Sequence, residues 1–261
     1  MNERTFSICQ QARIWFCLGF FAAANLAAED FSSAFNDANR LFEQGKYSDA
    51  VVGYEKMIRA GTVSVPLYFN LGNAFLKSGQ VGRAIVAYRN AEQMSPRDPD
   101  VRANLQFARD QAGGGTSPSR DRWKNWVSKL TLNEWAILAS SSVCLWFLFL
   151  AARQWKRDWR NSFRGMLAVL GLVGALVIVC LVVAFRYRAE QSSVVIVREA
   201  VVRRGPFDES PSAFTLRDGT EVTVLDKKDD WLQVADPAQR TGWLQGRQLI
   251  SLNEPLSLTK K

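Results

Sequence analysis

The chain has 261 residues, a net charge of +8 and no histidine, so it lacks the side chain that most often serves as a general base or metal ligand. Its four cysteines all lie in or beside apolar stretches, which leaves the polar segments without a cysteine framework for disulfides or zinc. The surplus charge lies in residues 113–192, which carry eleven basic and four acidic side chains around two apolar runs. This distribution is typical of membrane topology and argues against a nucleic-acid partner.

Residues 1–28 have the features of a secretory signal. Arg4 and Arg13 give a basic start, residues 14–24 form a short apolar core, and small residues that suit cleavage follow. The core is too short for an ordinary spanning helix. A cleaved signal and an uncleaved anchor both remain open, and either one predicts that the next segment is exported.

Residues 31–112 contain an internal repeat. Three pairs of residues are separated by 34 positions: Ala38 and Gly72, Ala50 and Ala84, Tyr54 and Tyr88. Small residues at such positions let two helices cross closely, while the tyrosines fill the second helix of each unit. A repeated 34-residue helix–turn–helix unit resembles the tetratricopeptide repeat (TPR) family. The resemblance implies an α-helical solenoid of two repeats and a capping helix.

Five asparagines follow the same period within this segment: Asn36, Asn39, Asn70, Asn73 and Asn104. The TPR resemblance implies that they lie on the concave side, where an amide can donate to and accept from the backbone of an extended peptide. Phe35 stands where a lysine would bind a free carboxylate in the clamp version of the family. Partner binding and simple solvation of an exposed helix face are both open interpretations.

Residues 113–134 are predicted to form a linker and an interfacial segment. Gly113 begins a run of three glycines, which is typical of a flexible connection. Residues 123–132 are expected to form a short interfacial helix, with Trp126, Val127 and Leu130 facing lipid.

Two apolar runs, residues 135–152 and 166–185, contain no charged side chain and are long enough to cross a bilayer. The loop between them, residues 153–165, is strongly basic, and short basic loops stay in the cytoplasm. Basic residues also precede the first run, so the export signal decides the orientation. We therefore expect a two-pass protein of a bacterial inner membrane, with the polar modules on the periplasmic or outer side.

Residues 193–252 are rich in short β-branched runs separated by turns, which predicts a small barrel. Their motifs are, in order, Gly205-Pro206, Asp218-Gly219-Thr220, Asp230-Trp231-Leu232-Gln233-Val234 and Gly242-Trp243-Leu244. This order resembles the bacterial SH3-like (SH3b) family, which implies cell-wall or peptide binding. Trp231 is the candidate ligand-binding residue, whereas Trp243 is expected in the core.

Together these segments predict a multidomain membrane protein: an α-helical TPR solenoid, two transmembrane helices and a small all-β SH3-like barrel. The order resembles the BatE-type proteins of Bacteroides aerotolerance operons. That resemblance implies partners among membrane proteins with von Willebrand-type domains and an associated AAA+ ATPase. We expect a non-catalytic scaffold that contacts membrane or periplasmic proteins and the lipid bilayer, without metal or cofactor. The alternative is an envelope sensor that binds peptidoglycan or its peptides through the SH3b domain.

Overall fold

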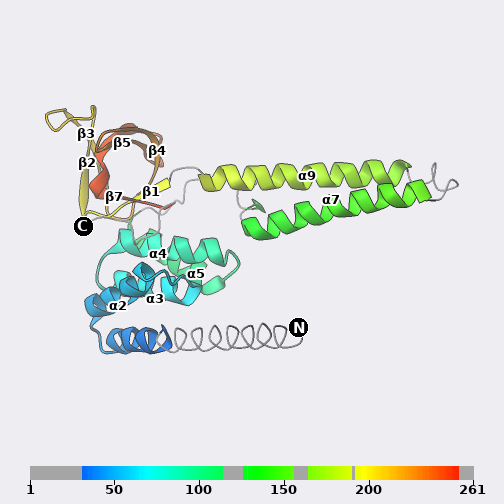
Figure 1. The fold of residues 1–261 in the computed structure, drawn as a ribbon. Helices are drawn as coiled ribbons and strands as arrows, with labels where there is room; N and C mark the ends of the chain where they lie inside the picture. Colours follow the sequence, from blue (N-terminus) through cyan, green and yellow to red (C-terminus); the bar gives the residue numbers. More distant parts are fainter. Residues whose placement is uncertain (1–30, 114–125, 128, 156–163, 190–191, 253–261) are drawn as a thin grey trace, which may run out of the picture. The chain divides into compact units, whose positions relative to one another are not determined.

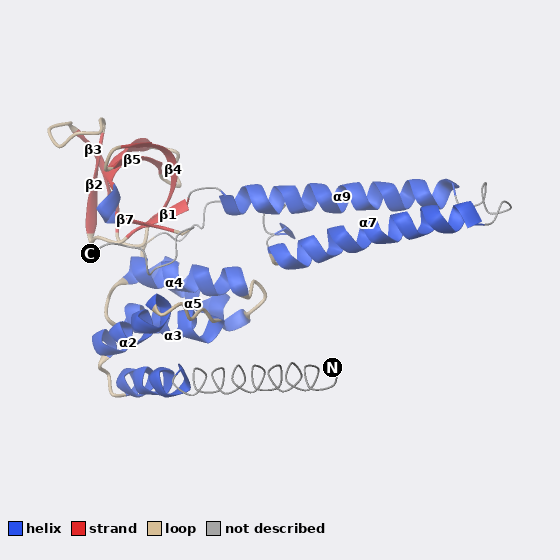
Figure 2. Cartoon of the chain, viewed as in Figure 1, coloured by secondary structure: helices blue, strands red, loops and turns tan. Residues whose placement is uncertain are grey.

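The structure is a computed structural model that describes residues 31–113, 126–127, 129–155, 164–189 and 192–252 (Figure 1). The predicted secretory signal lies outside the described residues, as do residues 114–125 of the predicted linker and residues 156–163 of the basic loop. The chain divides into two compact units, Met1–Val63 and Ser64–Lys261. Within the described part, long helices precede residue 190 and strands follow it (Figure 2).

The first unit contains a helix–turn–helix pair formed by residues 31–43 and α2 (Tyr47–Arg59). Gly45 in the turn has a φ of 76°, a left-handed conformation that glycine adopts without a steric penalty. Ala38 is 1% exposed, and a methyl group added at Gly53 would lie 3.0 Å from its Cβ. The two helices therefore approach closely through small side chains.

The second unit begins with three helices, α3 (Val65–Lys77), α4 (Val81–Met94) and α5 (Pro99–Gln111). Ser64 and Asp98 are the N-cap residues of α3 and α5, and their side chains accept hydrogen bonds from backbone N–H groups of the first turns. A proline lies within the first two residues of each helix, at Pro66 and Pro99, where a backbone N–H would have no partner within the helix. The turn between α3 and α4 contains Gly79, whose φ is 79°.

A close crossing of α3 and α4 depends on the absence of a side chain at Gly72. A methyl group added there would lie 2.6 Å from Cε1 of Tyr88, so the tyrosine ring occupies the space beside the glycine. Ala84 and Tyr88 are both 0% exposed. This part of the structure fits the expectation that small residues allow the helices to cross.

Helices α7 (Leu132–Trp155) and α9 (Arg164–Ala189) lie side by side and run in opposite directions (Figure 1). Both are long and apolar enough to cross a membrane. Ser140 and Ser142 donate hydrogen bonds to the carbonyl oxygens of Ala136 and Ala139 at 2.8 Å, so their hydroxyls are satisfied within α7. Trp146 donates through Nε1 to the Leu167 carbonyl oxygen at 3.2 Å, which links the two helices.

The expected interfacial helix differs from the structure at Val127. This residue is 2% exposed and packs with Trp135, Cys180 and Ala184 at one end of the helical pair. Nε1 of Trp135 donates to the Val127 carbonyl oxygen at 3.0 Å, which holds the segment in place. The prediction that Val127 faces lipid was wrong because it assumed an isolated helix, whereas α7 and α9 provide an apolar surface that covers this side chain.

Seven strands form the C-terminal region as one antiparallel sheet in the order β3-β2-β6-β5-β4-β1-β7. Their bounds are β1 (Ser192–Val195), β2 (Glu199–Arg203), β3 (Ser212–Arg217), β4 (Glu221–Lys228), β5 (Trp231–Ala235), β6 (Thr241–Gln245) and β7 (Leu249–Ser251). The sheet curls around a core that is mainly aliphatic: Val195, Ala200, Val202, Leu216, Val222, Val234, Leu244 and Leu249. The predicted small all-β module therefore begins at Ser192, close to the expected start.

Candidate binding site

The outer surface of β5 presents an aromatic and an amide side chain. Along this strand, Leu232 and Val234 point into the core, and alternation places Trp231 and Gln233 on the opposite face. Trp231 is partly exposed. The candidate residue from the sequence thus lies where a ligand can reach it.

The neighbouring strand β6 repeats this arrangement. Gly242 and Leu244 are buried, which leaves Trp243 and Gln245 on the outer face. Gly242 cannot carry a side chain because an added methyl group would overlap the Val202 side chain. The expectation that Trp243 belongs to the core was wrong, since its neighbours on either side take the inward positions.

The register of the two strands brings the four outward residues together. Trp231 pairs with Gln245, and Gln233 pairs with Trp243. The two tryptophans are therefore diagonal neighbours, a relationship that places their Cα atoms about 7–8 Å apart. We call Trp231, Gln233, Trp243 and Gln245 the tryptophan face.

The tryptophan face combines flat apolar area with hydrogen-bonding groups. An indole ring provides a large contact surface and an N–H donor, and an amide both donates and accepts. The Gln245 amide donates to Asp208 Oδ1 at 2.8 Å, which fixes its orientation from the loop between β2 and β3. Such a surface suits a ligand with alternating apolar and polar groups, such as an extended peptide or a glycan chain.

The predicted asparagines lie on the helices, but they do not share one environment. Asn36 is exposed, whereas Asn70 and Asn104 are partly buried on α3 and α5. Nδ2 of Asn104 donates to the Asp100 carbonyl oxygen one turn earlier in α5, at 3.0 Å. Asn70 and Asn73 lie one turn apart on α3, which is the spacing for a shared helix face.

Asn39 and Asn73 take part in contacts inside the helical pairs. Oδ1 of Asn39 accepts a hydrogen bond from the Tyr54 hydroxyl at 2.6 Å. Oδ1 of Asn73 accepts from the Tyr88 hydroxyl at 2.7 Å. Asn39 and Asn73 therefore hold buried tyrosine hydroxyls in place, which is a structural role separate from partner binding.

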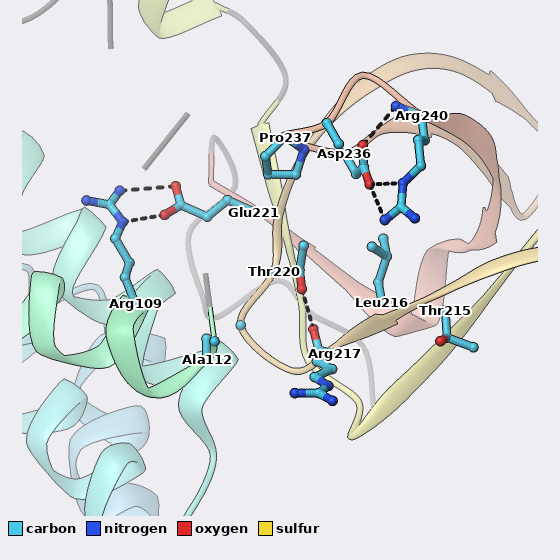
Figure 3. Close-up of a pocket in the computed structure, with 13 residues that line it drawn as sticks. Arg109, Ala112, Thr215, Leu216, Arg217, Thr220, Glu221, Asp236, Pro237 and Arg240 are labelled. Atoms are coloured by element: carbon cyan, nitrogen blue, oxygen red, sulfur yellow. Dashed lines mark hydrogen bonds and ion pairs between the residues drawn. The ribbon is translucent and has the colours of Figure 1, made fainter. Parts of the chain in front are cut away.

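A pocket of about 370 Å³ lies between α5 and the sheet (Figure 3). Its walls include the ends of α5 and β3 and the turn between β5 and β6. In that turn the Asp236 carboxylate accepts from the Arg240 backbone N–H at 2.8 Å and from its guanidinium at 2.7 Å (Figure 3). The Arg240 guanidinium also lies 4.4 Å from the centre of the Phe214 ring.

An ion pair on the helical side of this pocket was not predicted from the sequence. Nε and Nη2 of Arg109 donate to the two carboxylate oxygens of Glu221 at 2.5 and 3.2 Å (Figure 3). One signal was present, because the residue 34 positions before Arg109 is Phe75. An arginine at a position that is apolar in the preceding unit requires a partner.

Comparison with known proteins finds a family match for the C-terminal region. Residues 197–250 match the bacterial SH3 domain family. A search of curated proteins found no match to the chain. Among the described residues, no group of three or more cysteine and acidic side chains could hold a metal ion. The segment from β2 to β7 is therefore a bacterial SH3 domain, and the prediction of an SH3b module is confirmed.

Proposed function

We propose that this protein is a non-catalytic, membrane-anchored scaffold that presents two binding modules outside the cytoplasm. The observation that carries the proposal is the tryptophan face on a bacterial SH3 domain. The same chain contains two helices long and apolar enough to span a bilayer. A binding domain beside membrane anchors favours a role in holding partners at the membrane.

The chemistry of the chain favours binding over catalysis. It contains no histidine, and the residues of the tryptophan face are neutral. Neutral aromatic and amide groups supply contact area and hydrogen bonds, and they are poor nucleophiles and proton carriers. An extended ligand that lies across β5 and β6 would contact both tryptophans and both glutamines.

The helical segment is the second binding module of the proposal. The 34-residue repeat and its resemblance to TPR proteins support protein binding. Asn36 and Asn70 occupy equivalent positions, as do Asn39 and Asn73, and Asn104 continues the first series. The resemblance to BatE-type proteins would supply the partners: membrane proteins with von Willebrand-type domains and an AAA+ ATPase, in an envelope-stress or aerotolerance complex of a bacterial inner membrane.

A second candidate function is an envelope sensor that binds peptidoglycan or its peptides. The tryptophan face favours this candidate as well, because flat indole rings and amides suit sugar rings and peptide groups alike. The two functions predict different partners for one surface, so they can be separated experimentally.

The experiment uses the full-length protein in membranes and measures the binding of proteins and of peptidoglycan separately. The first is chemical crosslinking followed by identification of bound proteins, and the second is co-sedimentation with purified peptidoglycan sacculi. Trp231→Ala and Trp243→Ala are the test variants. Phe107→Ala is the control, because Phe107 is 60% exposed but lies on α5, outside the SH3 domain.

The scaffold proposal expects protein partners that are lost in the tryptophan variants and kept in the Phe107 variant. Retention of sacculi that depends on Trp231, without any protein partner, would replace the scaffold with the sensor. If both tryptophan variants behave as the wild type in both captures, the tryptophan face is not a binding surface.

A further inference from the structure

The turn between β3 and β4 supplies a cap for a helix far away in the sequence. Oδ1 of Asp218 accepts a hydrogen bond from the Gly82 backbone N–H, in the first turn of α4, at 3.0 Å. Gln80, the residue that precedes α4, makes no capping bond with its side chain. The first N–H groups of a helix need acceptors, and here an acceptor comes from the SH3 domain.

The contact is so close that it depends on two glycines. A methyl group added at Gly82 would overlap the Val195 carbonyl oxygen and Oδ1 of Asp218. A methyl group added at Gly219 would lie 2.6 Å from Cβ of Ala112 and 3.1 Å from Cδ1 of Ile85. Glycine weakens a helix, so Gly82 within α4 requires a reason, and the neighbouring strand provides one.

Two arginines of the helices meet one carboxylate of the sheet. Arg109, which is 8% exposed, forms the paired hydrogen bonds with Glu221 (Figure 3). Nη2 of Arg89 lies 3.4 Å from the same carboxylate. Burial opposes the charge on Arg89, but Glu221 and Glu92 outweigh it, so the pKa of Arg89 is raised.

Arg109 replaces an apolar residue of the 34-residue repeat. The positions 34 and 68 residues before Arg109 are Phe75 and Leu41, and Phe75 is 0% exposed. The apolar side chain at this position of the preceding repeat is therefore buried, and an arginine in its place needs a partner for its charge. Among the residues that the structure describes, no helix of the repeat follows α5, and Arg109 pairs instead with Glu221 of β4.

We propose that the SH3 domain is the terminal cap of the helical stack. In this arrangement Asp218 caps α4 and Glu221 pairs with Arg109 and Arg89, so helices α3–α5 and the sheet act as one rigid unit. The end surface of α4 and α5 is thereby occupied by the chain itself. This inference does not depend on what either module binds.

Contact between the helices and the sheet restricts the membrane topology and leaves the tryptophan face free for a ligand. The helices α3–α5 precede the antiparallel pair α7 and α9, and the sheet follows it, so direct contact requires both modules on the same side of a bilayer. Glu221 begins β4, whereas Lys228 ends it and pairs with Trp231. The cap therefore uses one end of the strand and leaves the tryptophan face accessible at the other.

The test is site-directed crosslinking in the full-length protein in membranes. The native cysteines are first replaced by alanine: Cys9, Cys17, Cys144 and Cys180. Ala112→Cys and Thr220→Cys then provide a pair on the two walls of the pocket. A short bis-maleimide reagent joins them, and a specific protease site inserted within residues 156–163 separates the halves unless they are crosslinked. Ala112→Cys with Lys228→Cys is the control pair, at the far end of β4.

The variant Gly82→Ala tests whether the crosslink depends on the close contact between α4 and the sheet. Alanine is the better helix former, so the helix itself is not weakened, but the added methyl group should push the sheet away and reduce the crosslinked product about tenfold. Ser48→Ala, at the equivalent position 34 residues earlier, should leave the product unchanged. Asp218→Ala tests the same contact from the other side, and circular dichroism checks that each variant folds.

The expected result is an efficient crosslink for the Thr220 pair, little for the Lys228 pair, and loss of the product in Gly82→Ala and Asp218→Ala. A folded Gly82→Ala protein that crosslinks as well as its parent would overturn the proposal. Equal crosslinking of the Thr220 and Lys228 pairs would also overturn it, since no fixed contact would then exist.

Discussion

The hydroxyl of Tyr88 donates a hydrogen bond to Oδ1 of Asn73 at 2.7 Å. The same bond recurs 34 residues earlier, where Tyr54 donates to Asn39 at 2.6 Å. Both tyrosines are almost completely buried, and a buried hydroxyl needs a partner. The asparagine at this position of each repeat therefore supports the fold, a packing role that the sequence analysis did not include.

Asn73→Ala should lower the free energy of unfolding by about 1–3 kcal/mol, because the buried Tyr88 hydroxyl loses its acceptor. The higher helix propensity of alanine offsets only part of this loss. Urea unfolding of the detergent-solubilised chain, followed by circular dichroism, measures the change. Asn104→Ala is the control, since that amide bonds only within its own helix in the contacts described. Equal effects of the two substitutions would show that the Tyr88 contact contributes nothing.

Alkaline pH should destabilise the helices through the same tyrosine. Burial raises the pKa of Tyr88 above the ordinary value of 10.0. The neutral form is therefore favoured in the folded chain, and its stabilising contribution is complete below pH 10.0 and is lost as the pH rises from there toward the folded pKa. Tyr88→Phe should show a smaller fall in melting temperature between about pH 9 and pH 11. An identical alkaline fall in both proteins would contradict the assignment.

Gly72→Ala should lower the free energy of unfolding of the α3–α4 pair, although alanine has a higher helix propensity than glycine. The added methyl group would press on the Tyr88 ring, and overpacking of this kind costs about 1–3 kcal/mol. Gly165→Ala is the matched control, because nothing lies within 4 Å of a methyl group at that position. Thermal unfolding of both variants provides the measurement. A melting temperature at or above that of the wild type for Gly72→Ala would contradict the close crossing of α3 and α4.

Asn70→Ala tests partner binding by the helices without removing the acceptor of Tyr88. If this amide holds the backbone of a partner, loss of one hydrogen bond should reduce affinity about two- to tenfold. The change is measured as the affinity of the purified protein for a crosslinked partner that the Trp231 and Trp243 variants retain. Trp231→Ala should leave this interaction intact, because it alters a different module. If Asn70→Ala binds as tightly as the wild type, Asn70 takes no part in partner binding.

The local features of this chain could be predicted from sequence, and the distant contacts could not. The turns at Gly45 and Gly79 and the hydroxyl bonds of Ser140 and Ser142 depend on residues a few positions apart. The outward position of the Trp243 ring follows from the alternation of side chains along β6, because the neighbouring Leu244 points inward.

The pairing of Arg109 with Glu221 joins residues 112 positions apart across two apolar helices. No periodic pattern links such positions, so only the exception to the repeat at Arg109 pointed to it. Val127 was misplaced for a similar reason, since its partners Cys180 and Ala184 come from a helix much later in the chain.

Both modules are proposed to lie outside the cytoplasm on a two-pass anchor, and reporter fusions measure on which side of the membrane each segment lies. A reporter active only in the cytoplasm is fused after Lys261 in one protein and inserted at residues 156–163 in another. The predicted export signal and the basic loop lead us to expect activity for the loop insertion and none for the Lys261 fusion. Activity after Lys261 together with silence in the loop would contradict the topology, and with it the proposal that these modules bind envelope partners.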